Sequence, residues 1–204
     1  MKKVWISILN QGTIHLGLAD VLLKMASDNR YKLHINYPDL KPDTVNRNRI
    51  VADFLESGYD YLLMIDDDTV PLKNPLDLVE LDKDIINFAV PQWREGDVYW
   101  VALDRVKDGW KPLPVERRAG LQEVDATGSA CILIKREVFE KIDKPFFMPK
   151  YGDDGIKFTG QDYLFCEKAK KQGFKVWVHF DYIASHFKEI NILEILKLLT
   201  KNSE

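Results

Sequence analysis

The stretch that decides the fold is Tyr61-Leu62-Leu63-Met64-Ile65-Asp66-Asp67-Asp68-Thr69-Val70-Pro71. Five large, mostly apolar residues lead directly into three aspartates, and a proline follows shortly after. A short, continuous apolar run bounded by turn residues is typical of a strand buried on both faces of an α/β sheet. Ligands bind beyond the carboxyl ends of such strands. We therefore expect an α/β fold with a mostly parallel central sheet flanked by helices, and a ligand site at 66–68.

The three aspartates are a costly arrangement unless something neutralises them. In an extended chain Asp66 and Asp68 lie roughly 6.6 Å apart, and at an effective dielectric of ~20 their repulsion is on the order of 2–3 kcal/mol. A hard divalent cation with oxygen ligands would remove this cost and supply a Lewis acid. The structural alternative is an acidic turn that only solvates the end of a strand.

Length and composition describe an ordinary globular chain. Its 204 residues are 46% hydrophobic and 30% charged, which is enough for one domain with a sizeable core. The net charge of −3 argues against a nucleic-acid partner. Cys131 and Cys166 lie inside apolar patterns without C-x-x-C spacing, so we expect buried free thiols and a cytoplasmic location. No apolar run is long enough for a signal peptide or a membrane span.

Apolar periodicity, caps and glycines predict alternating strands and helices along the chain. Strands are expected at 4–9, 32–36, 61–65, 84–90 and 174–180, and 124–134 is expected to be a glycine-marked turn that leads into a strand. Helices are expected from 13 or 14 to 28, from 43 or 44 to 57, from 74 or 75 onward, and at 135–142, 160–172 and 190–201. The segment 91–120 is expected to be functional or to contain a hairpin, with 98–103 as one arm. Loops are expected at 145–159, which we interpret as mobile, and at 185–186.

The helix expected to begin at residue 43 or 44 carries one arginine inward. Its apolar stripe consists of Ile50, Val51, Phe54 and Leu55. Arg47 lies three residues before this stripe and therefore continues it toward the helix N-terminus. A cation beside the free N–H groups of a helix start suits a phosphate. Arg49 instead shares a face with Asp53, so we expect a solvated ion pair worth a few tenths of a kcal/mol.

A later helix also directs a carboxylate inward. Asp162, Phe165, Cys166 and Ala169 follow the i, i+3, i+4, i+7 spacing of a buried helical stripe. Asp162 thus occupies the first turn of that stripe, where it can serve a site or simply interact with the helix dipole. Because an outward-facing aspartate would interact with the dipole equally well, we favour the functional interpretation.

Five motifs in order resemble those of GT-A fold glycosyltransferases, especially the family 2-like branch. They are Asn46-Arg47-Asn48, the DxD-like Asp66-Asp67-Asp68, the glycine loop Ala126-Thr127-Gly128-Ser129-Ala130, the segment Gly160-Gln161-Asp162-Tyr163-Leu164-Phe165-Cys166, and a closing strand at 173–178 followed by His186. Each motif alone is weak, but five in order are specific. The resemblance covers most of the chain and implies a single GT-A-like (Rossmann-like) domain at 1–187, with a C-terminal helix and tail at 188–204.

The resemblance also implies a reaction and a division of roles. Residues 1–70 would form the nucleotide-binding half and residues 84–187 the acceptor half. The enzyme would move a sugar from a nucleotide-diphosphate sugar to a hydroxyl of a glycan, lipid or protein. Asp162 would be the catalytic base, which favours an inverting reaction, and Gly128 would let the backbone approach donor and acceptor.

The same resemblance assigns further residues to the donor and to a metal. Asp66 would face the ribose or the metal, and Asp68 would ligate the Mn²⁺ or Mg²⁺ ion that bridges the diphosphate. His186 would be a further metal ligand or a diphosphate contact. The set expected to bind the nucleotide sugar also includes Asn10, Arg47 and Asp67.

Two departures from the family pattern leave alternatives open. Gln161 replaces the acidic residue before the base, and Pro38-Asp39 replaces an acidic stretch after the second strand. A carbohydrate- or nucleotide-binding fold without turnover is one alternative. A haloacid-dehalogenase-type phosphatase, with Asp66 as nucleophile and Asp68 as acid/base, is another. A sugar-nucleotide pyrophosphorylase is disfavoured because its glycine-rich, arginine-containing signature is missing after the first strand.

Tryptophans and the C-terminal helix carry two further predictions. Trp93, Trp100 and Trp110 can stack on sugar rings, although aromatic residues more often pack in a core. Residues 190–199 contain seven Ile or Leu side chains. Because the polar face of this helix carries both charge signs, we favour packing on the core or on a second copy in a homodimer over weak contact with a membrane surface.

Overall fold

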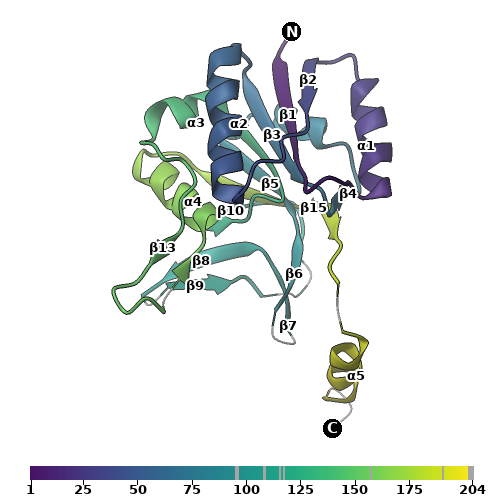
Figure 1. Ribbon diagram of the computed structural model, residues 1–204, viewed down its shortest axis with the longest axis vertical. Helices are drawn as coiled ribbons and strands as arrows, with labels where there is room; N and C mark the ends of the chain where they lie inside the picture. The colour runs from purple at the N-terminus through teal and green to yellow at the C-terminus, as the bar shows by residue number, and fades with distance from the viewer. Residues whose placement is uncertain are drawn as a thin grey trace.

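Figure 1 shows the computed structural model, which describes residues 1–94, 97–107, 109–114, 116, 118–156, 158–189 and 191–201. The strands are β1 (Lys3–Leu9), β2 (Lys32–Asn36), β3 (Tyr61–Asp66), β4 (Thr69–Pro71), β5 (Ile85–Ala89), β6 (Pro91–Arg94), β7 (Asp97–Trp100), β8 (Ala102–Val106), β9 (Gly109–Pro112), β10 (Leu121–Val124), β11 (Ala126–Thr127), β12 (Cys131–Lys135), β13 (Lys150–Tyr151), β14 (Phe158–Thr159) and β15 (Val176–His186). The helices are α1 (Leu16–Ala26), α2 (Asp43–Ser57), α3 (Arg136–Lys141), α4 (Gln161–Lys171), α5 (Ile192–Lys201) and the 3₁₀ helix η1 (Pro75–Leu81).

The central sheet has eight strands in the order β10-β15-β5-β12-β3-β1-β2, with β4 paired to the far end of β15. Strands β1, β2, β3, β5 and β15 run in one direction, whereas β4, β10 and β12 run in the other. The predicted α/β class with a mostly parallel sheet is therefore confirmed. β3 lies between β1 and β12, in the interior of the sheet.

The interior position of β3 explains the continuous apolar run before the aspartates. Side chains at 61, 63 and 65 join the core beneath α1 and η1, whereas those at 62 and 64 join the core beneath α2, α3 and α4. Because both faces are covered, every residue from Tyr61 to Ile65 is buried, as predicted. Asp66 is the first residue of the strand that is partly exposed, so the polar site begins where the cover ends.

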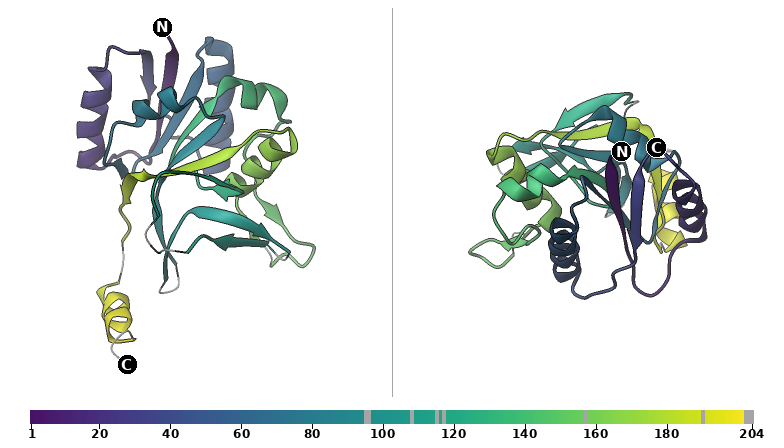
Figure 2. Two further views of the ribbon diagram at one scale, coloured as in Figure 1. Left: turned by 180° about the vertical axis from the view of Figure 1, so that it is seen from behind. Right: turned by 90° about the horizontal axis from the view of Figure 1, so that it is seen from above.

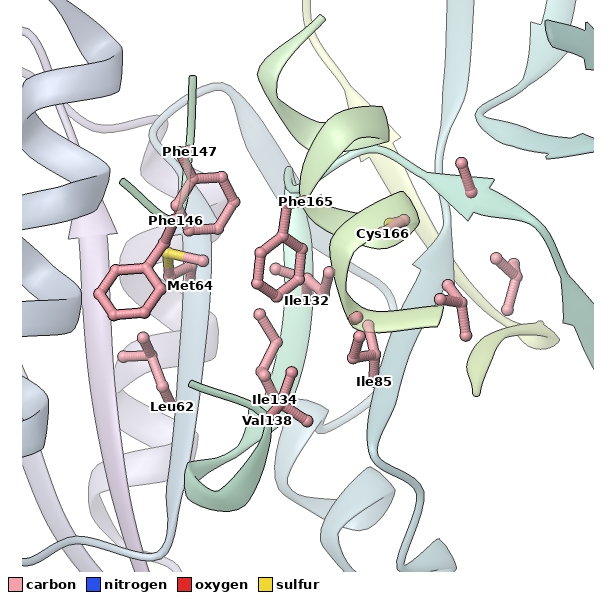
Figure 3. Packing of buried hydrophobic residues seen from close by; sticks show 14 of the residues in the cluster. Leu62, Met64, Ile85, Ile132, Ile134, Val138, Phe146, Phe147, Phe165 and Cys166 are labelled. Carbon is pink, nitrogen blue, oxygen red and sulfur yellow. The ribbon is translucent and has the colours of Figure 1, made fainter. Parts of the chain in front are cut away.

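Aromatic side chains pack between α4 and the chain at 146–147 (Figure 3). The rings of Phe147 and Phe165 stack with their centroids 4.7 Å apart. Asn48 of α2 fixes the chain beside them, since its Oδ1 accepts from the backbone N–H groups of Phe146 at 2.8 Å and Phe147 at 3.1 Å. Cys166 is buried on the same face of α4, and both cysteines are free thiols, as predicted.

The 91–120 segment forms hairpins. β6 pairs with β7, and β8 pairs with both β9 and β11. The prediction of a hairpin is confirmed. However, 98–103 is not a single arm, because it is divided between β7 and β8. Val101 lies between these two strands and donates its backbone N–H to the Val90 carbonyl. The segment 145–159 contains a further short hairpin, formed by β13 and β14.

β15 extends through His186, so the prediction of a loop at 185–186 is wrong. After a register shift between His179 and Ile183, the strand leaves β5 and pairs with β4, where His186 lies opposite Thr69. The backbone partners for this extension come from a distant segment of the sequence, which local patterns do not reveal. The extension carries His186 to the strand that directly follows the aspartates.

α2 begins at Asp43, within the predicted start, but neither Asp43 nor Thr44 is its N-cap, as their position at the expected helix start had suggested. The cap position is Pro42, which makes no side-chain hydrogen bond. Asp43, whose side chain is exposed, pairs instead with Arg47 one turn further along the helix. At the other end Gly58 adopts a φ of +69° and closes the helix, as predicted.

Figure 2 shows α5 apart from the sheet, joined to it by the chain that follows β15. Its Ile192, Leu193 and Leu196 are exposed, so packing of this helix on the core of its own chain is wrong for the described residues. The dimer and membrane-surface alternatives stay predictions, and Ile190 lies outside the described residues. None of the helices that the structure describes is long and apolar enough to cross a membrane.

Candidate active site

Arg47 lies at the centre of a charged cluster formed by α2, β3 and α4. Only 3% of its side chain is exposed, and its guanidinium lies 2.8 Å from Asp66 Oδ1 and 3.4 Å from Asp43 Oδ2. The contact with Asp43 is an ion pair without hydrogen-bond geometry. Burial lowers the pKa of Arg47, but Asp66, Asp162 and Asp43 raise it above its ordinary value, so the side chain stays charged. The predicted inward orientation of Arg47 is confirmed.

Arg49 behaves as a surface residue. Its side chain is 65% exposed and pairs with Asp53 at 2.9 Å, which confirms the predicted solvated ion pair. One helix thus carries two arginines with different surroundings, because only Arg47 continues the buried stripe.

Asp162 lies across the cluster from Asp66, on the first turn of α4. Its Oδ1 accepts a 2.8 Å hydrogen bond from Ser129 Oγ, and the Ser129 carbonyl accepts from Arg47 at 3.5 Å. Burial raises the pKa of Asp162, while the nearby Arg47 and the hydrogen bond from Ser129 oppose the increase. Ser129 therefore fixes the position of the Asp162 carboxylate, and burial gives that carboxylate an elevated affinity for a proton.

Asp66 has a similar electrostatic environment. Burial raises its pKa to about 6, Arg47 opposes the shift, and the charge of Asp162 adds to it. The ion pair with Arg47 occupies Oδ1. Asp66 thus shares one cation with Asp162, and the two carboxylates oppose each other's ionisation.

Asp68 lies among cations and has the opposite electrostatic character. Its Oδ2 lies 2.5 Å from Lys188 Nζ, and its Oδ1 lies 3.6 Å from His186 Nε2. Burial raises the pKa of Asp68, but the hydrogen bonds to His186 and Lys188 outweigh it and hold the pKa well below its usual range. Asp68 therefore stays ionised.

His186 is oriented for a role as a ligand. Its Nδ1 lies 2.9 Å from the carbonyl oxygen of Pro91. A carbonyl can only accept, so Nδ1 carries the proton, and Nε2 is the ring nitrogen that faces Asp68. A backbone carbonyl that fixes the tautomer in this way is the usual support of a metal-binding histidine.

The fit to Mn²⁺ or Mg²⁺ rests on two of the three predicted ligands. Asp68 and His186 present an oxygen and a nitrogen to one point, and Lys188 already brings a positive charge to Asp68. Asp66 is not part of this pair, because its Oδ1 faces Arg47. Among the described residues, no group of three or more His, Cys, Asp or Glu side chains could hold a metal ion. The pair fits an ion whose remaining ligands are diphosphate oxygens and water.

Asn10 and Asp67 organise the loop after β1. The Asp67 carboxylate accepts from the backbone N–H of Gln11 at 3.0 Å, and the Asn10 Oδ1 accepts from that of Gly12 at 3.0 Å. The Asn10 side chain also donates to the Pro38 carbonyl in the loop after β2. The structure therefore places Asn10 directly after β1 and Asp67 directly after β3, at the carboxyl ends of these two neighbouring strands.

Gly128 is closely packed. A Cβ at this position would lie 3.0 Å from the Val101 side chain. The Gly128 carbonyl accepts a 2.8 Å hydrogen bond from the buried Asn87 of β5. Gly128 is itself buried, so its neighbour Ser129, rather than the glycine, brings a functional group to the site.

Three residues with roles in the site were not assigned by sequence reasoning. Ser129 positions Asp162, Lys188 neutralises Asp68, and Asn48 anchors the chain at 146–147. Ser129 and Asn48 belong to recognised motifs, so their positions were available in the sequence. Lys188 has no comparable signal, because only the pairing of β15 with β4 brings it to Asp68.

Gln161 stands where the family pattern has an acidic residue. Its Nε2 donates to Asp43 at 3.3 Å, and its Oε1 is buried without a hydrogen-bond partner in the described structure. An acidic side chain here would add a negative charge beside Asp43 and Asp162. The amide therefore limits the excess of carboxylates around Arg47.

Comparison with solved structures finds this fold in several other proteins. The A197 protein from STIV matches with a TM-score of 0.63 and 24% identity, over 92% of this chain and 86% of that chain. GalNAc-T7, solved with UDP, GalNAc and Mn²⁺, matches with a TM-score of 0.54 and 10% identity, over 98% of this chain and 48% of that chain. UDP-glucose pyrophosphorylase, complexed with UDP-glucose, matches with a TM-score of 0.50 and 8% identity, over 100% and 99%.

These similarities show the fold. The chain has the GT-A-like architecture that glycosyltransferases share with a pyrophosphorylase. No family model and no curated protein matches the sequence. Membership of the family 2-like branch therefore stays a prediction.

Proposed function

We propose that the protein is a metal-dependent glycosyltransferase, which moves a sugar from a nucleotide sugar to an acceptor hydroxyl with inversion. The observation that carries the proposal is the placement of two carboxylates at one end of the sheet: Asp162 accepts a 2.8 Å hydrogen bond from Ser129, whereas Asp68 lies beside His186 and Lys188. The pKa of Asp162 is raised and that of Asp68 is lowered. Environments that shift the pKa values of two carboxylates in opposite directions are typical of a proton acceptor and a permanently charged ligand.

In the proposed reaction Asp162 removes the proton from the acceptor hydroxyl as that oxygen bonds to the anomeric carbon. The bond between the anomeric carbon and the diphosphate oxygen breaks, and its electron pair leaves with the nucleoside diphosphate. This in-line displacement inverts the anomeric carbon. The raised pKa of Asp162 moves it toward the operating pH, and Ser129 holds the carboxylate in place.

The leaving diphosphate needs its growing charge neutralised. When bound, Mn²⁺ or Mg²⁺ supplies that charge, and Asp68 Oδ1 and His186 Nε2 would hold the ion. Asp66 would face the ribose from its ion pair with Arg47. The remaining donor contacts in the proposal come from the loops that contain Asn10, Asp67 and Gly128.

The proposal includes a cytoplasmic location, which the two free thiols support. It also includes an acceptor of the glycan, lipid or protein class. The fold neighbours support the donor half of the proposal, because GalNAc-T7 and the pyrophosphorylase were both solved with uridine nucleotides.

A thermal-shift panel tests the proposal. UDP, GDP, CDP and dTDP are added with and without Mn²⁺, and one diphosphate is expected to stabilise the protein only when the metal is present. A ligand at 100 times its Kd stabilises by ~2.7 kcal/mol, which is visible as an increase in Tm. No stabilisation by any diphosphate, together with stabilisation by Mg²⁺ and a phosphate mimic, would favour the phosphatase alternative instead.

Two variants separate binding from transfer. Asp68→Ala is expected to lose metal-dependent nucleotide binding, and retained Mn²⁺-dependent affinity in calorimetry would contradict the metal assignment. Asp162→Asn is expected to keep donor binding and lose transfer, and unchanged turnover would refute the base assignment. A wild-type protein that binds donor and releases no nucleoside diphosphate would be a binding fold. Release of pyrophosphate from a nucleoside triphosphate and a sugar phosphate would identify a pyrophosphorylase.

A further inference from the structure

One cation beside the proposed metal pair has no assigned role in the reaction. Lys188 lies with its ammonium group 2.5 Å from Asp68 Oδ2, and its side chain is 42% exposed. His186 approaches the other oxygen of the same carboxylate, with Nε2 3.6 Å from Oδ1. The Asp68 carboxylate therefore presents one oxygen to the proposed metal ligand His186 and the other oxygen to a lysine.

The backbone next to Lys188 is held at the site. The backbone N–H of Phe187 donates to the Asp68 carbonyl at 2.9 Å, and the Phe187 ring stacks on His15 with the centroids 3.8 Å apart. After this segment the chain leaves the sheet toward α5 (Figure 2). An exposed lysine has a flexible four-carbon side chain. Lys188 can therefore exchange one partner for another while its backbone stays beside Asp68.

The charge of the proposed metal site indicates that a second cation is needed. A His186 ring that ligates through Nε2 is neutral, so a divalent cation held by this ring and the Asp68 carboxylate has a net charge of about +1. The diphosphate of a nucleotide sugar carries a negative charge on each phosphate, and cleavage of its bond to the sugar adds another. Part of the diphosphate charge is therefore left without a partner.

Arg47 does not supply the missing charge, although its place at the start of α2 suits a phosphate. Only 3% of its side chain is exposed, and its guanidinium lies 2.8 Å from Asp66 and 3.4 Å from Asp43. It also donates to the Ser129 carbonyl at 3.5 Å. A guanidinium buried among these partners is not free to move to a ligand. Lys188 is exposed, and among the described residues its partner is the carboxylate of the metal pair itself.

We propose that Lys188 is an exchangeable counter-ion, which pairs with Asp68 in the free protein and with the donor diphosphate in the complex. Once the charge of Asp68 is neutralised at Oδ1, the ammonium group is no longer attracted to Oδ2, and the diphosphate is the nearest anion to which it can move. The inference rests on the proposed function, because it assigns a donor contact in that reaction. Lys188 then helps to neutralise the leaving nucleoside diphosphate.

The exchange makes metal and nucleotide bind cooperatively. With metal alone, Lys188 loses its pair with Asp68 and gains no new partner. With nucleotide alone, Lys188 can reach the diphosphate only by leaving Asp68 unpaired. Asp68 and Lys188 both keep a partner of opposite charge only when metal and nucleotide are present together. The coupling is reciprocal, because each ligand raises the affinity for the other by the same factor.

The alternative is that Lys188 only balances the charge of Asp68, and the two roles differ in the sign of one effect. If the lysine is a simple competitor of the metal, its removal strengthens metal binding, and diphosphate binding through the metal becomes stronger as well. If the lysine moves to the diphosphate, its removal strengthens the binding of metal alone but weakens the binding of diphosphate. Diphosphate affinity at saturating metal therefore separates the two roles.

Three variants of the full-length protein test the exchange. Lys188→Met removes the charge and Lys188→Arg keeps it. Lys171→Met is the matched control, because it removes a lysine that is 70% exposed from an ion pair with Glu167 on α4. Calorimetry at saturating Mn²⁺ measures the Kd of UDP, or of whichever of GDP, CDP and dTDP the thermal-shift panel identifies. The corresponding monophosphate is the probe that lacks the second phosphate.

Lys188→Met is expected to bind the diphosphate about tenfold more weakly than wild type, because a charge-assisted contact is lost. Its affinity for the monophosphate is expected to stay within about threefold of wild type, as are both affinities of Lys188→Arg and of Lys171→Met. The factor by which Mn²⁺ strengthens diphosphate binding is expected to fall about fivefold or more in Lys188→Met and to be unchanged in the control.

Diphosphate binding that is unchanged or stronger in Lys188→Met would overturn the inference and leave the proposed function standing. Equal losses for diphosphate and monophosphate would do the same, because they would show that Lys188 does not contact the second phosphate. A loss of similar size in Lys171→Met would reveal a general effect of net charge and would also overturn the inference. Absence of metal-dependent diphosphate binding in the wild-type protein would instead refute the proposed function, and the inference with it.

Discussion

At the residue scale, the charge balance of the site depends on Arg47. One buried guanidinium faces Asp43, Asp66 and Asp162, so the cluster holds more negative than positive charge. This excess is compatible with folding because Asp43 is exposed and because the pKa values of Asp66 and Asp162 are raised. The same excess gives Asp162 its affinity for a proton.

Arg47→Ala is expected to lower the free energy of unfolding by about 3 kcal/mol, because the substitution leaves partly buried carboxylates without their cation. Arg49→Ala, in the same helix, removes only an exposed ion pair and is expected to change stability by less than ~0.5 kcal/mol. Urea denaturation measures both values. Similar effects for the two variants would show that Arg47 does not balance the cluster.

Asp66 predicts a pH dependence with a defined sign. Because folding raises its pKa from 3.8 to about 6, the folded protein binds more protons than the unfolded chain across this window. The free energy of unfolding therefore falls as pH rises through the window. Between pH 5 and 7.5, in EDTA, wild type is expected to lose about 1–1.5 kcal/mol more than Asp66→Asn. Parallel pH profiles in urea denaturation would contradict the raised pKa.

At the scale of elements, β15 brings His186 to Asp68, and these are the two residues that would hold a metal ion. Its first half pairs with β5 in the sheet, and its second half pairs with β4, which follows the aspartates. The segment continues with Phe187, whose ring stacks on His15 at 3.8 Å, and Lys188, which reaches Asp68. β15 and the residues that directly follow it therefore bring both His186 and Lys188 to Asp68.

Lys188→Met is expected to strengthen Mn²⁺ binding in the absence of nucleotide by about three- to tenfold, because a divalent cation no longer has to displace the ammonium group from Asp68. Titration of free Mn²⁺ by EPR measures the change. Lys171→Met, which removes an exposed pair with Glu167 on α4, is the control and is expected to leave Mn²⁺ affinity unchanged. Unchanged or weaker binding in Lys188→Met would argue that the lysine does not compete with the metal.

At the scale of the whole molecule, the sheet and its two cores form one body, and α5 lies apart from it (Figure 2). Truncation after Glu189 is expected to change the Tm by less than ~2 °C, because the exposed apolar side chains of α5 add little burial to the fold. Calorimetry of the full-length and truncated chains measures the difference. A decrease of more than ~5 °C would show that α5 packs on the body or on a second copy.

The sequence by itself determined the elements whose signal is local. Burial on both faces of β3, the inward orientation of Arg47, the solvated pair of Arg49 and the free buried cysteines all follow from periodicity within one strand or helix. The candidate residues Asp66, Asp68 and Asp162 were found for the same reason, since each lies where a regular apolar pattern becomes polar.

The tertiary structure decided which of these residues meet. The pairing of His186 with Asp68, of Ser129 with Asp162 and of Arg47 with Asp66 depends on strand order. Local patterns encode burial, because burial depends on periodicity along one element. They do not encode partnership between segments far apart in the chain, because partnership depends on how the sheet orders its strands.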